Sequence, residues 1–514
     1  MPTLNTGGAS LPAPATYQVG DGVNIEAPRR GALGWWTQSS ITGQATLTNN
    51  ANYGESNVRD GDLILEAIPA IAFNREGARL RVNGFVSLDM IGYVEGTQVN
   101  RILPQANILA NLEAVEKIFF IDGAVLANQA VVNPYLPSSA SSTNNLYTYA
   151  QARVAPYLQS RIGQNVSWLI RSDNTYTWTT QTNNPLGDAY YARNLAQVVR
   201  DPTPFGLTLR FTNDFTRVKN QVQPDQTLNT GLAIFDYAFS PQLTAGLRGG
   251  YETTTYTATA EAGPIYGANI AWKPSPTTSL VGYWEERFYG PSYQFNASNR
   301  QRQLATNLNF YRTITTYPQL LLTIPPTTNV AGLLSAILTA RFPDPTVRQE
   351  QVTDLINRQA LPDSLPAGTN IYNQSANILT GGNVSSGLIG TRNTLMFNVF
   401  YLRTEMLPDA RVPPTFLAFN NSDQLGGGVT LSHALTPIIN LNGTISGYET
   451  KGFGPTEGLE TRQGLASLQA NFVLSKRSTF FVGTRYQYQK NKGTVSAFQD
   501  TSEAAVFTGL FHQL

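Results

Sequence analysis

Several residue types that metal sites and soluble folds depend on are scarce in this chain. Its 514 residues include no cysteine and only two histidines, His433 and His512. Thiolate and imidazole are the usual zinc ligands, so we expect no metal site, no cofactor and no disulfide framework. Charged residues make up only 13% of the chain, whereas roughly 25% is usual for soluble proteins. The net charge of +1 gives no reason to expect nucleic-acid binding.

Long apolar runs are also missing. No stretch reaches the ~18 consecutive apolar residues that a membrane-spanning helix requires, and the segment 330–340, which has a helical pattern, is too short. The mean hydropathy is −0.20, yet aromatic residues make up 11% of the chain. Few charges, many aromatics and a neutral mean hydropathy favour strands with one lipid-facing side and one wet side.

Hydrophobic and polar residues alternate with a period of two over long stretches. Within 243–252, Leu243, Leu247 and Tyr251 share one face, while Arg248 and Glu252 share the other. The segments 80–90, 166–178 and 205–215 show the same pattern. A soluble sandwich or propeller also alternates, but its strands average ~5–6 residues, whereas tilted membrane strands need ~9–11. These long runs therefore predict an all-β, antiparallel transmembrane β-barrel.

The order of strands and turns predicts how the barrel is organised. We expect about twenty strands, within a range of 18–22, and an even number places both termini on the periplasmic side. The expected parts are an N-terminal periplasmic segment (1–34), barrel strands 1–14 (35–316), a helical insert (317–390) and strands 15–20 (391–514). Because such a barrel must cross the inner membrane to reach the outer one, we expect a signal peptide to have been removed already.

The segment 317–390 differs in character from the rest of the chain. It contains an apolar helical pattern over 330–340 and a second over 345–357, with Asp344 as N-cap and Pro345 at the first helical position. Strand parity places it on the periplasmic side. Three interpretations remain open: a plug in the lumen, a docking element for a periplasmic partner, or a miscounted strand that would move it outside. The plug or docking candidates are Asp344, Arg348, Glu350 and Asp354.

Two segments of the chain resemble each other. Residues 231–253 and 427–450 each contain a Ser-Pro or Thr-Pro turn and close on Gly-Tyr-Glu-Thr. Barrels can grow by duplication of hairpins, so this repeat supports the predicted fold class without indicating an activity.

A collective set of short motifs resembles one known family. The motifs are Asp62-Leu63-Ile64 to Ile68-Pro69, Tyr149–Tyr157 ending in Ala155-Pro156-Tyr157, Phe239-Ser240-Pro241 with Gly250-Tyr251-Glu252, Trp272-Lys273-Pro274-Ser275-Pro276, Glu286-Arg287-Phe288-Tyr289-Gly290-Pro291-Ser292-Tyr293, Ile314-Thr315-Thr316, and Phe342-Pro343-Asp344-Pro345 with Arg348. Over residues 60–514 the chain resembles the uncharacterised outer-membrane β-barrel proteins associated with PEP-CTERM/exosortase exopolysaccharide gene clusters. The resemblance implies an outer-membrane location and a link to exopolysaccharide production or export. None of these motifs is catalytic.

The inward-facing residues are the candidates for function. Opposite charges recur on the predicted inward faces, at Arg79, Arg81 and Asp89, Arg171 and Asp173, Arg210 and Asp214, and Arg248 and Glu252. They either brace the wall as structural ion pairs or line a hydrophilic pore with a transverse field, and their mixed sign predicts weak ion selectivity. We expect no enzyme, although an outer-membrane hydrolase would need His433 or His512 beside an activated serine.

Three functions fit this pattern. The first is a monomeric channel for export or assembly of an exopolysaccharide, in contact with outer-membrane lipid and, through 317–390, with a periplasmic export partner. The second is a general or substrate-specific diffusion porin, which would need a constriction loop folded inward from outside; the sequence shows no candidate for one. The third is a structural barrel that scaffolds outer-membrane partners.

Overall fold

The computed structural model describes most of the chain. The described residues are 18–19, 23–24, 34–54, 59–131, 133–136, 139–179, 187–219, 225–257, 261–322, 330–339, 341–344, 375–407, 421–493 and 500–514, with scattered positions between 347 and 369.

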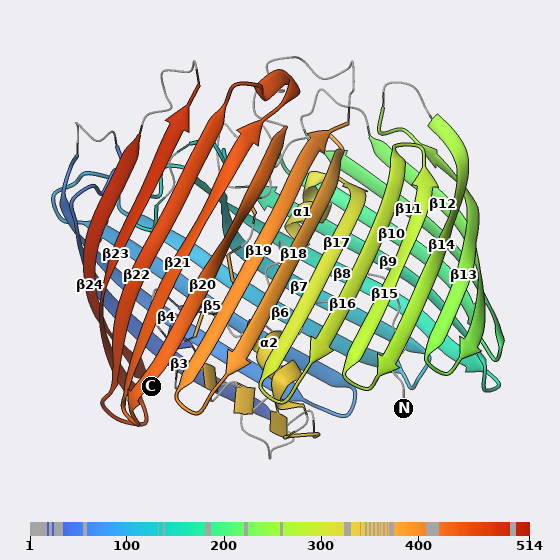
Figure 1. The fold of residues 1–514 in the computed structure, drawn as a ribbon, viewed down its shortest axis with the longest axis horizontal. Helices are drawn as coiled ribbons and strands as arrows, with labels where there is room; N and C mark the ends of the chain where they lie inside the picture. Colours follow the sequence, from blue (N-terminus) through green and yellow to red (C-terminus); the bar gives the residue numbers. More distant parts are fainter. Residues whose placement is uncertain are drawn as a thin grey trace.

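Antiparallel strands β3 to β24 close into one barrel of 22 strands (Figure 1). Their bounds are β3 Trp35–Thr48, β4 Asp62–Glu76, β5 Leu80–Tyr93, β6 Arg101–Val115, β7 Phe119–Val131, β8 Leu146–Ile162, β9 Val166–Thr179, β10 Ala189–Arg200, β11 Phe205–Val218, β12 Gln226–Ser240, β13 Leu243–Thr254, β14 Glu261–Ser275, β15 Thr278–Arg287, β16 Gly290–Arg300, β17 Leu304–Thr315, β18 Asn377–Ile389, β19 Asn393–Met406, β20 Ser422–Thr436, β21 Ile439–Gly452, β22 Glu460–Val473, β23 Ser478–Lys492 and β24 Thr501–Gln513. The other elements are β1 Gln18–Val19, β2 Val23–Asn24, α1 Tyr317–Leu322, α2 Val330–Leu338 and the 3₁₀ turn η2 Gly454–Thr456.

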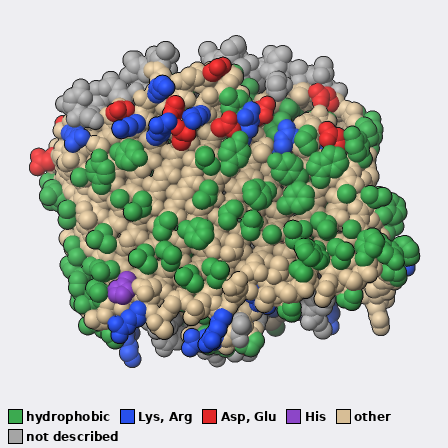
Figure 2. All heavy atoms as spheres, in the orientation of Figure 1, with side chains coloured by type: hydrophobic (Ala, Val, Ile, Leu, Met, Phe, Trp, Pro, Cys, Tyr) green, Lys and Arg blue, Asp and Glu red, His purple; other side chains and the backbone are tan. Residues whose placement is uncertain are grey.

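The barrel has no open edge, because β24 pairs with β3 along its length, for example Phe511 with Thr42. Its outward face carries exposed apolar side chains such as Leu247, Ile445 and Val506. Figure 2 shows these hydrophobic side chains across the middle of the wall and charged ones gathered at the two rims. No helix among the described residues is long and apolar enough to cross a bilayer. Closure pairs the backbone groups of the strands with one another, and the apolar outer band faces lipid, which together is the construction of an outer-membrane barrel.

Two strands were missed by the sequence analysis, β16 and β18, so the barrel has two strands more than the twenty predicted. Both are rich in Gly, Ser and Asn, which have low strand propensity. In β18 the glycines are needed by the neighbouring strand. A Cβ on Gly381 would lie 2.4 Å from the Tyr311 ring, and one on Gly382 would lie 2.5 Å from the Phe310 ring. Aromatic rings of β17 therefore fill the space that side chains of β18 would occupy.

The two ends of the barrel differ. Short turns such as 241–242, 276–277 and 437–438 lie at one end, together with the start of β3 and the end of β24 (Figure 1). Most connections at the other end are longer, including 132–145 and 407–421. The strand number is even, as predicted, and the first strand begins at the end where the last strand finishes. In bacterial outer-membrane barrels, short turns lie on the periplasmic side.

The insert starts at the opposite end from the one predicted. Strands β3 to β17 precede it, which is fifteen strands rather than fourteen, because β16 is a strand. The insert therefore leaves β17 at the long-loop end and spans 316–376, since β18 occupies 377–389. Seven strands follow it rather than six. Of the two predicted helices, α2 matches 330–340, while much of 345–357 lies outside the described residues.

Both copies of the repeated segment form hairpins, β12–β13 and β20–β21. Each carries a register shift just before its turn, at Ala238/Ser240 and at Ala434/Thr436. The repeat in sequence is therefore also a repeat in local strand geometry.

Candidate functional site: the barrel lumen

A network of charged side chains covers part of the inward face of β7 to β9. Arg171 binds Asp173 at 2.9 Å, as predicted, because residues two apart on a strand share a face. Arg171 also binds Asp122 of β7 at 2.7 Å, and its guanidinium lies 4.9 Å from the centre of the Tyr157 ring. Arg153 of β8 forms a second ion pair with Asp173. These pairs join three strands, so they brace the wall while leaving a polar surface toward the lumen.

Other predicted charges also face the lumen but have different partners. Arg248 binds Glu285 of β15 at 2.5 Å, and Glu252 forms its ion pair with Arg287. The predicted pairing of Arg248 with Glu252 fails because four residues along one strand span roughly 13 Å at ~3.3 Å per residue. Both residues instead bind partners on β15, two strands away in the barrel.

Arg210 and Asp214 are also four residues apart on one strand, and they bind other partners instead of each other. Arg210 Nε donates to Gln197 Oε1 at 2.8 Å. Asp214 accepts from the Tyr191 hydroxyl at 2.5 Å, and the Arg193 guanidinium lies 3.8 Å from it. Arg210 therefore contributes positive charge to the lumen without a carboxylate partner among the described residues.

The remaining predicted group, on β5, does not form a cluster. Arg79 lies in the turn before β5, outside the strand. Arg81 and Asp89 both face the lumen but lie near opposite ends of β5, roughly 26 Å apart at ~3.3 Å per residue. These three residues therefore do not form one site.

The insert lies inside the barrel, with α1 in the upper half of Figure 1 and α2 near the short-turn end. A hydrophobic cluster joins α2 and the segment after it to the inward faces of β17 and β19. Its buried members are Ala305, Val330, Ala331, Leu333, Leu334, Ile337, Val352, Ile356, Leu361, Leu365 and Met396. Gln424 of β20 donates to the Thr369 carbonyl at 2.7 Å. Apolar burial thus holds the insert against the β17–β20 wall.

The first helix of the insert crosses to the far wall. The Tyr317 hydroxyl donates to the Gly187 carbonyl at 2.5 Å, and Gln151 of β8 donates to the Pro318 carbonyl at 3.3 Å. Gln319 Nε2 donates to Asp214 at 3.4 Å. The insert therefore divides the lumen, with the β11–β17 sector on one side of it.

The predicted plug residues lie at the tip of the insert. Asp344 Oδ1 accepts from the Val347 backbone N–H at 3.2 Å, which is the N-cap contact that the sequence predicted. Arg348 donates to Ser335 Oγ at 3.1 Å and to the Phe342 carbonyl at 3.0 Å, so it fastens the tip to α2. Glu350 and Asp354 lie outside the described residues.

A second inward segment was not recognised in the sequence. The loop 133–145 between β7 and β8 folds from the long-loop end into the lumen, where Ser141 Oγ donates to Glu503 of β24 and accepts from Arg485 of β23 at 2.7 Å. The Tyr135 hydroxyl donates to the Asn421 carbonyl at 2.9 Å, and burial raises the pKa of Tyr135 to about 12. The sequence analysis found no candidate for a loop that folds inward from this end, and loop 133–145 is such a loop. Its Ser- and Asn-rich composition is typical of an ordinary surface loop, and the sequence does not reveal these partners because they are 286 to 362 residues away.

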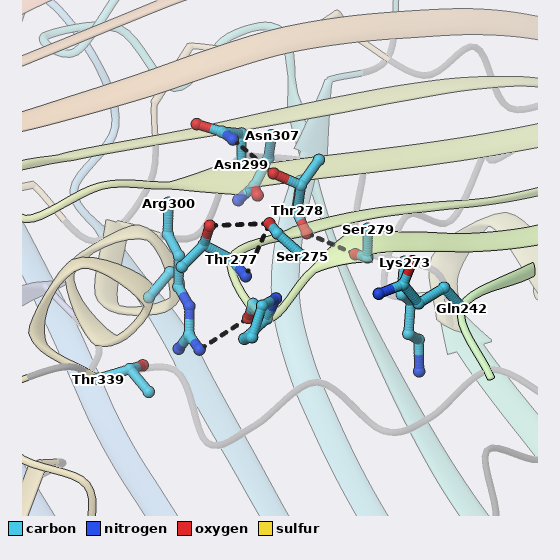
Figure 3. Close-up of a pocket in the computed structure, with 13 residues that line it drawn as sticks. Gln242, Lys273, Ser275, Thr277, Thr278, Ser279, Asn299, Arg300, Asn307 and Thr339 are labelled. Atoms are coloured by element: carbon cyan, nitrogen blue, oxygen red, sulfur yellow. Dashed lines mark hydrogen bonds between the residues drawn. The ribbon is translucent and has the colours of Figure 1, made fainter.

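A polar cavity of about 560 Å³ opens at the short-turn end, between α2 and the β12–β17 wall (Figure 3). Most of its lining residues carry hydroxyl or amide groups, two are cations, and Pro276 and Ala336 are apolar. The remaining lining residues are Gln242, Lys273, Ser275, Thr277, Thr278, Ser279, Ser298, Asn299, Arg300, Asn307 and Thr339. Among the described lining residues there is no carboxylate. The cavity therefore offers hydrogen bonds and positive charge to a hydrophilic ligand.

The two histidines face outward on the barrel wall. His433 Nδ1 lies 2.6 Å from Asn393 Oδ1, and His512 Nδ1 lies 3.0 Å from Ser478 Oγ. No described carboxylate contacts either ring. A nucleophilic serine requires a histidine that a third group orients, so the Ser478–His512 pair is an incomplete catalytic arrangement. The described residues also contain no cluster of metal-ligating side chains.

Neither protein-family models nor curated proteins match this sequence. Several solved structures are similar in architecture. One is a variant of the ferric enterobactin receptor PfeA of Pseudomonas aeruginosa in complex with enterobactin, with 9% identity, a TM-score of 0.48, and coverage of 94% of this chain and 82% of that one. Another is the FrpB iron transporter of Neisseria meningitidis, with 8% identity, a TM-score of 0.47, and coverage of 93% and 82%. The siderophore receptor PirA of Pseudomonas aeruginosa has 6% identity, a TM-score of 0.44, and coverage of 93% and 80%. At these values the similarity extends to the barrel architecture alone.

Proposed function

We propose that the protein is an outer-membrane channel for hydrophilic solutes of the saccharide class, with the solute path along the β11–β17 sector of the lumen. The observation that carries this proposal is the polar cavity at the short-turn end. Its many hydroxyl and amide groups match the donors and acceptors of a sugar, and Lys273 and Arg300 favour sugars that carry acidic groups.

The wall above the cavity continues the same chemistry. Gln294, Asn296 and Ser298 of β16 face inward and are exposed, so a solute in the lumen can reach them. Farther toward the long-loop end the path meets the Arg248–Glu285 ion pair, with the Arg248 guanidinium 4.4 Å from the centre of the Tyr283 ring. Aromatic faces and charged hydrogen-bonding groups in one line suit a carbohydrate chain better than an apolar ligand.

Export or assembly of an exopolysaccharide is the specific form of this proposal. It agrees with the family resemblance of the sequence, and it requires the insert to shift or a chain to pass beside it. Arg341 and Asp344 are exposed and follow Thr339, which lines the cavity at the short-turn end, so this tip of the insert supports docking of a periplasmic partner. A diffusion porin is the second candidate, because loop 133–145 folds inward from the long-loop end as a constriction loop does.

Conductance across planar bilayers tests the channel. The matched variant replaces residues 316–376 with a short Asn-Gly turn, because Thr315 and Asn377 are paired neighbours that a tight turn can connect. We expect the native protein to conduct and acidic oligosaccharides to block it reversibly. The variant should conduct more and be blocked less, because it lacks the α2 side of the cavity.

Two outcomes would contradict the proposal. A protein that stays closed in both forms would instead be a scaffold. Equal conductance in both forms, with no saccharide block in either, would show that the insert and the cavity are not on the path and would favour a general porin.

A further inference from the structure

The outward face of β9 to β13 carries a row of hydrogen-bonded polar side chains where lipid is expected. Ser172, Asn194, Asn213, Asn229 and Thr253 are direct cross-strand neighbours in that order. They face outward, because inward-facing residues such as Asp173, Arg193 and Asp214 alternate with them along their strands. Polar groups facing hydrocarbon are costly, so this row requires a physical reason.

The row forms one continuous chain of hydrogen bonds. Ser172 donates to Asn194 at 2.8 Å, Asn194 to Asn213 at 3.1 Å, Asn213 to Asn229 at 2.7 Å and Asn229 to Thr253 at 3.2 Å. Each of the three asparagines donates one of its two amide hydrogens within the row. Three amide N–H groups thus remain without an acceptor among the described residues, spaced at about the ~4.8 Å separation of adjacent strands.

An apolar groove lies directly beside this row, on its short-turn side. On each strand, the outward-facing residue one step closer to the short-turn end than the asparagine lines the groove. These residues are Ala196 beside Asn194, Phe211 beside Asn213 and Gly231 beside Asn229. The groove has a volume of about 730 Å³, with small side chains on its floor between bulky ones. Its outward lining residues are Trp168, Ile170, Ala196, Val198, Leu209, Phe211, Gly231, Ala233, Gly249 and Tyr251.

Groove and row together match an amphiphile in the outer leaflet. The groove extends toward the middle of the membrane, where an acyl chain lies, and the amide row lies on the long-loop side, where the acyl linkages begin. The row carries donors but no charge, so it fits neutral carbonyl acceptors rather than a charged headgroup. Three donors in line need several carbonyls close together, which a lipid with many ester- and amide-linked acyl chains provides.

We infer that this face is a binding site for one multiply acylated glycolipid of the lipid A class. Its linkage carbonyls accept hydrogen bonds from Asn194, Asn213 and Asn229, and one acyl chain occupies the groove. A second copy of the barrel is a poorer occupant, because two convex barrel walls in contact would leave the groove as a void. The inference is independent of the solute that the channel carries.

Lipid retention tests this site. The protein, purified from outer membranes and washed in mild detergent, is examined by native mass spectrometry. Two variants remove the site: the triple change Asn194→Leu, Asn213→Leu, Asn229→Leu, and Gly249→Leu, which fills the groove. A Cβ on Gly249 meets no atom within 4 Å, so the second variant should fold.

Gly43→Leu is the matched control. Gly43 is an outward-facing glycine of β3, also with open space around a Cβ, and it lies far from the groove. Heat-modifiable migration on gels confirms that each variant is a folded barrel. We expect the native protein and Gly43→Leu to retain one glycolipid, and both site variants to lose it.

Other outcomes overturn the inference. Retention of phospholipid instead of glycolipid would identify a different lipid class. A dimer that the site variants convert to monomer would identify a second copy as the occupant. Retention that is equal in all forms, or absent from the native protein, would leave only bulk lipid at this face.

Discussion

Removing the Ser141 hydroxyl should release the inward loop 133–145 from the wall. Ser141 is the residue of this loop that contacts the buried ion pair between Arg485 and Glu503, whose charged groups lie 3.6 Å apart. The Ser141→Ala variant loses both contacts but keeps the ion pair. Glu503 still accepts a hydrogen bond from the Thr48 hydroxyl at 2.8 Å, so the variant does not leave its buried carboxylate without a hydrogen-bond partner. The change should therefore act on the loop and leave the barrel folded.

The size of the effect follows from the kind of hydrogen bond that is lost. A hydrogen bond to a charged group contributes about 1.5–3 kcal/mol, and ~1.4 kcal/mol corresponds to a tenfold change in an equilibrium. Removing the hydroxyl should thus raise the ratio of open to docked loop by about ten- to a hundredfold. We expect the open probability of single channels to rise accordingly.

Single-channel recording of Ser141→Ala beside Ser142→Ala measures this effect. Ser142 is buried in the same loop, but among the described residues its hydroxyl accepts a hydrogen bond only from the backbone N–H of Asn144. The control should therefore keep the native open probability. If both variants behave alike, or if Ser141→Ala conducts as the native protein does, the ion pair does not hold the loop and the reasoning fails.

Three further predictions concern other parts of the barrel. The pKa of Tyr135 is raised, so the docking that it contributes is complete below its unfolded value of ~10 and is lost as the pH rises toward 12; Tyr135→Phe should abolish a rise in open probability over this interval. Gly381→Val should destabilise the barrel by about 1–3 kcal/mol in urea unfolding, because its side chain would collide with Tyr311, while Gly43→Ala should not. Lys273→Glu should weaken block by acidic oligosaccharides, whereas Lys476→Glu, at the same end but outside the cavity lining, should leave the block unchanged.

These predictions would each fail in a recognisable way. A pH response that persists in Tyr135→Phe would assign it to another group. Equal unfolding of the two glycine variants would mean that the β17 rings can move aside. Equal block in the two lysine variants would remove the cavity from the solute path.

The lumen shows how far sequence reasoning reached toward the candidate site. The alternation of side chains placed Arg171, Asp173 and Arg210 on the inward face, because facing depends only on position along one strand. It paired Arg171 with Asp173 for the same reason. The predicted pairing of Arg248 with Glu252 was wrong. Their partners Glu285 and Arg287 lie on another strand, and partners across strands depend on the register of the sheet.

The sequence alone determined the class of the fold. Long period-two runs, few charges and short turns specify a transmembrane barrel, because each of these features follows from local geometry and from the contrast between lipid and water. The tertiary structure decided what fills the barrel. The glycines of β18 are required because the aromatic rings of β17 pack against them. The number of strands before the insert depends on β16, whose polar sequence does not predict a strand. Loop 133–145 and helix α1 of the insert contact strands that are far away in sequence, such as β23 and β24 for the loop and β8 for α1, and the closed barrel brings these segments together.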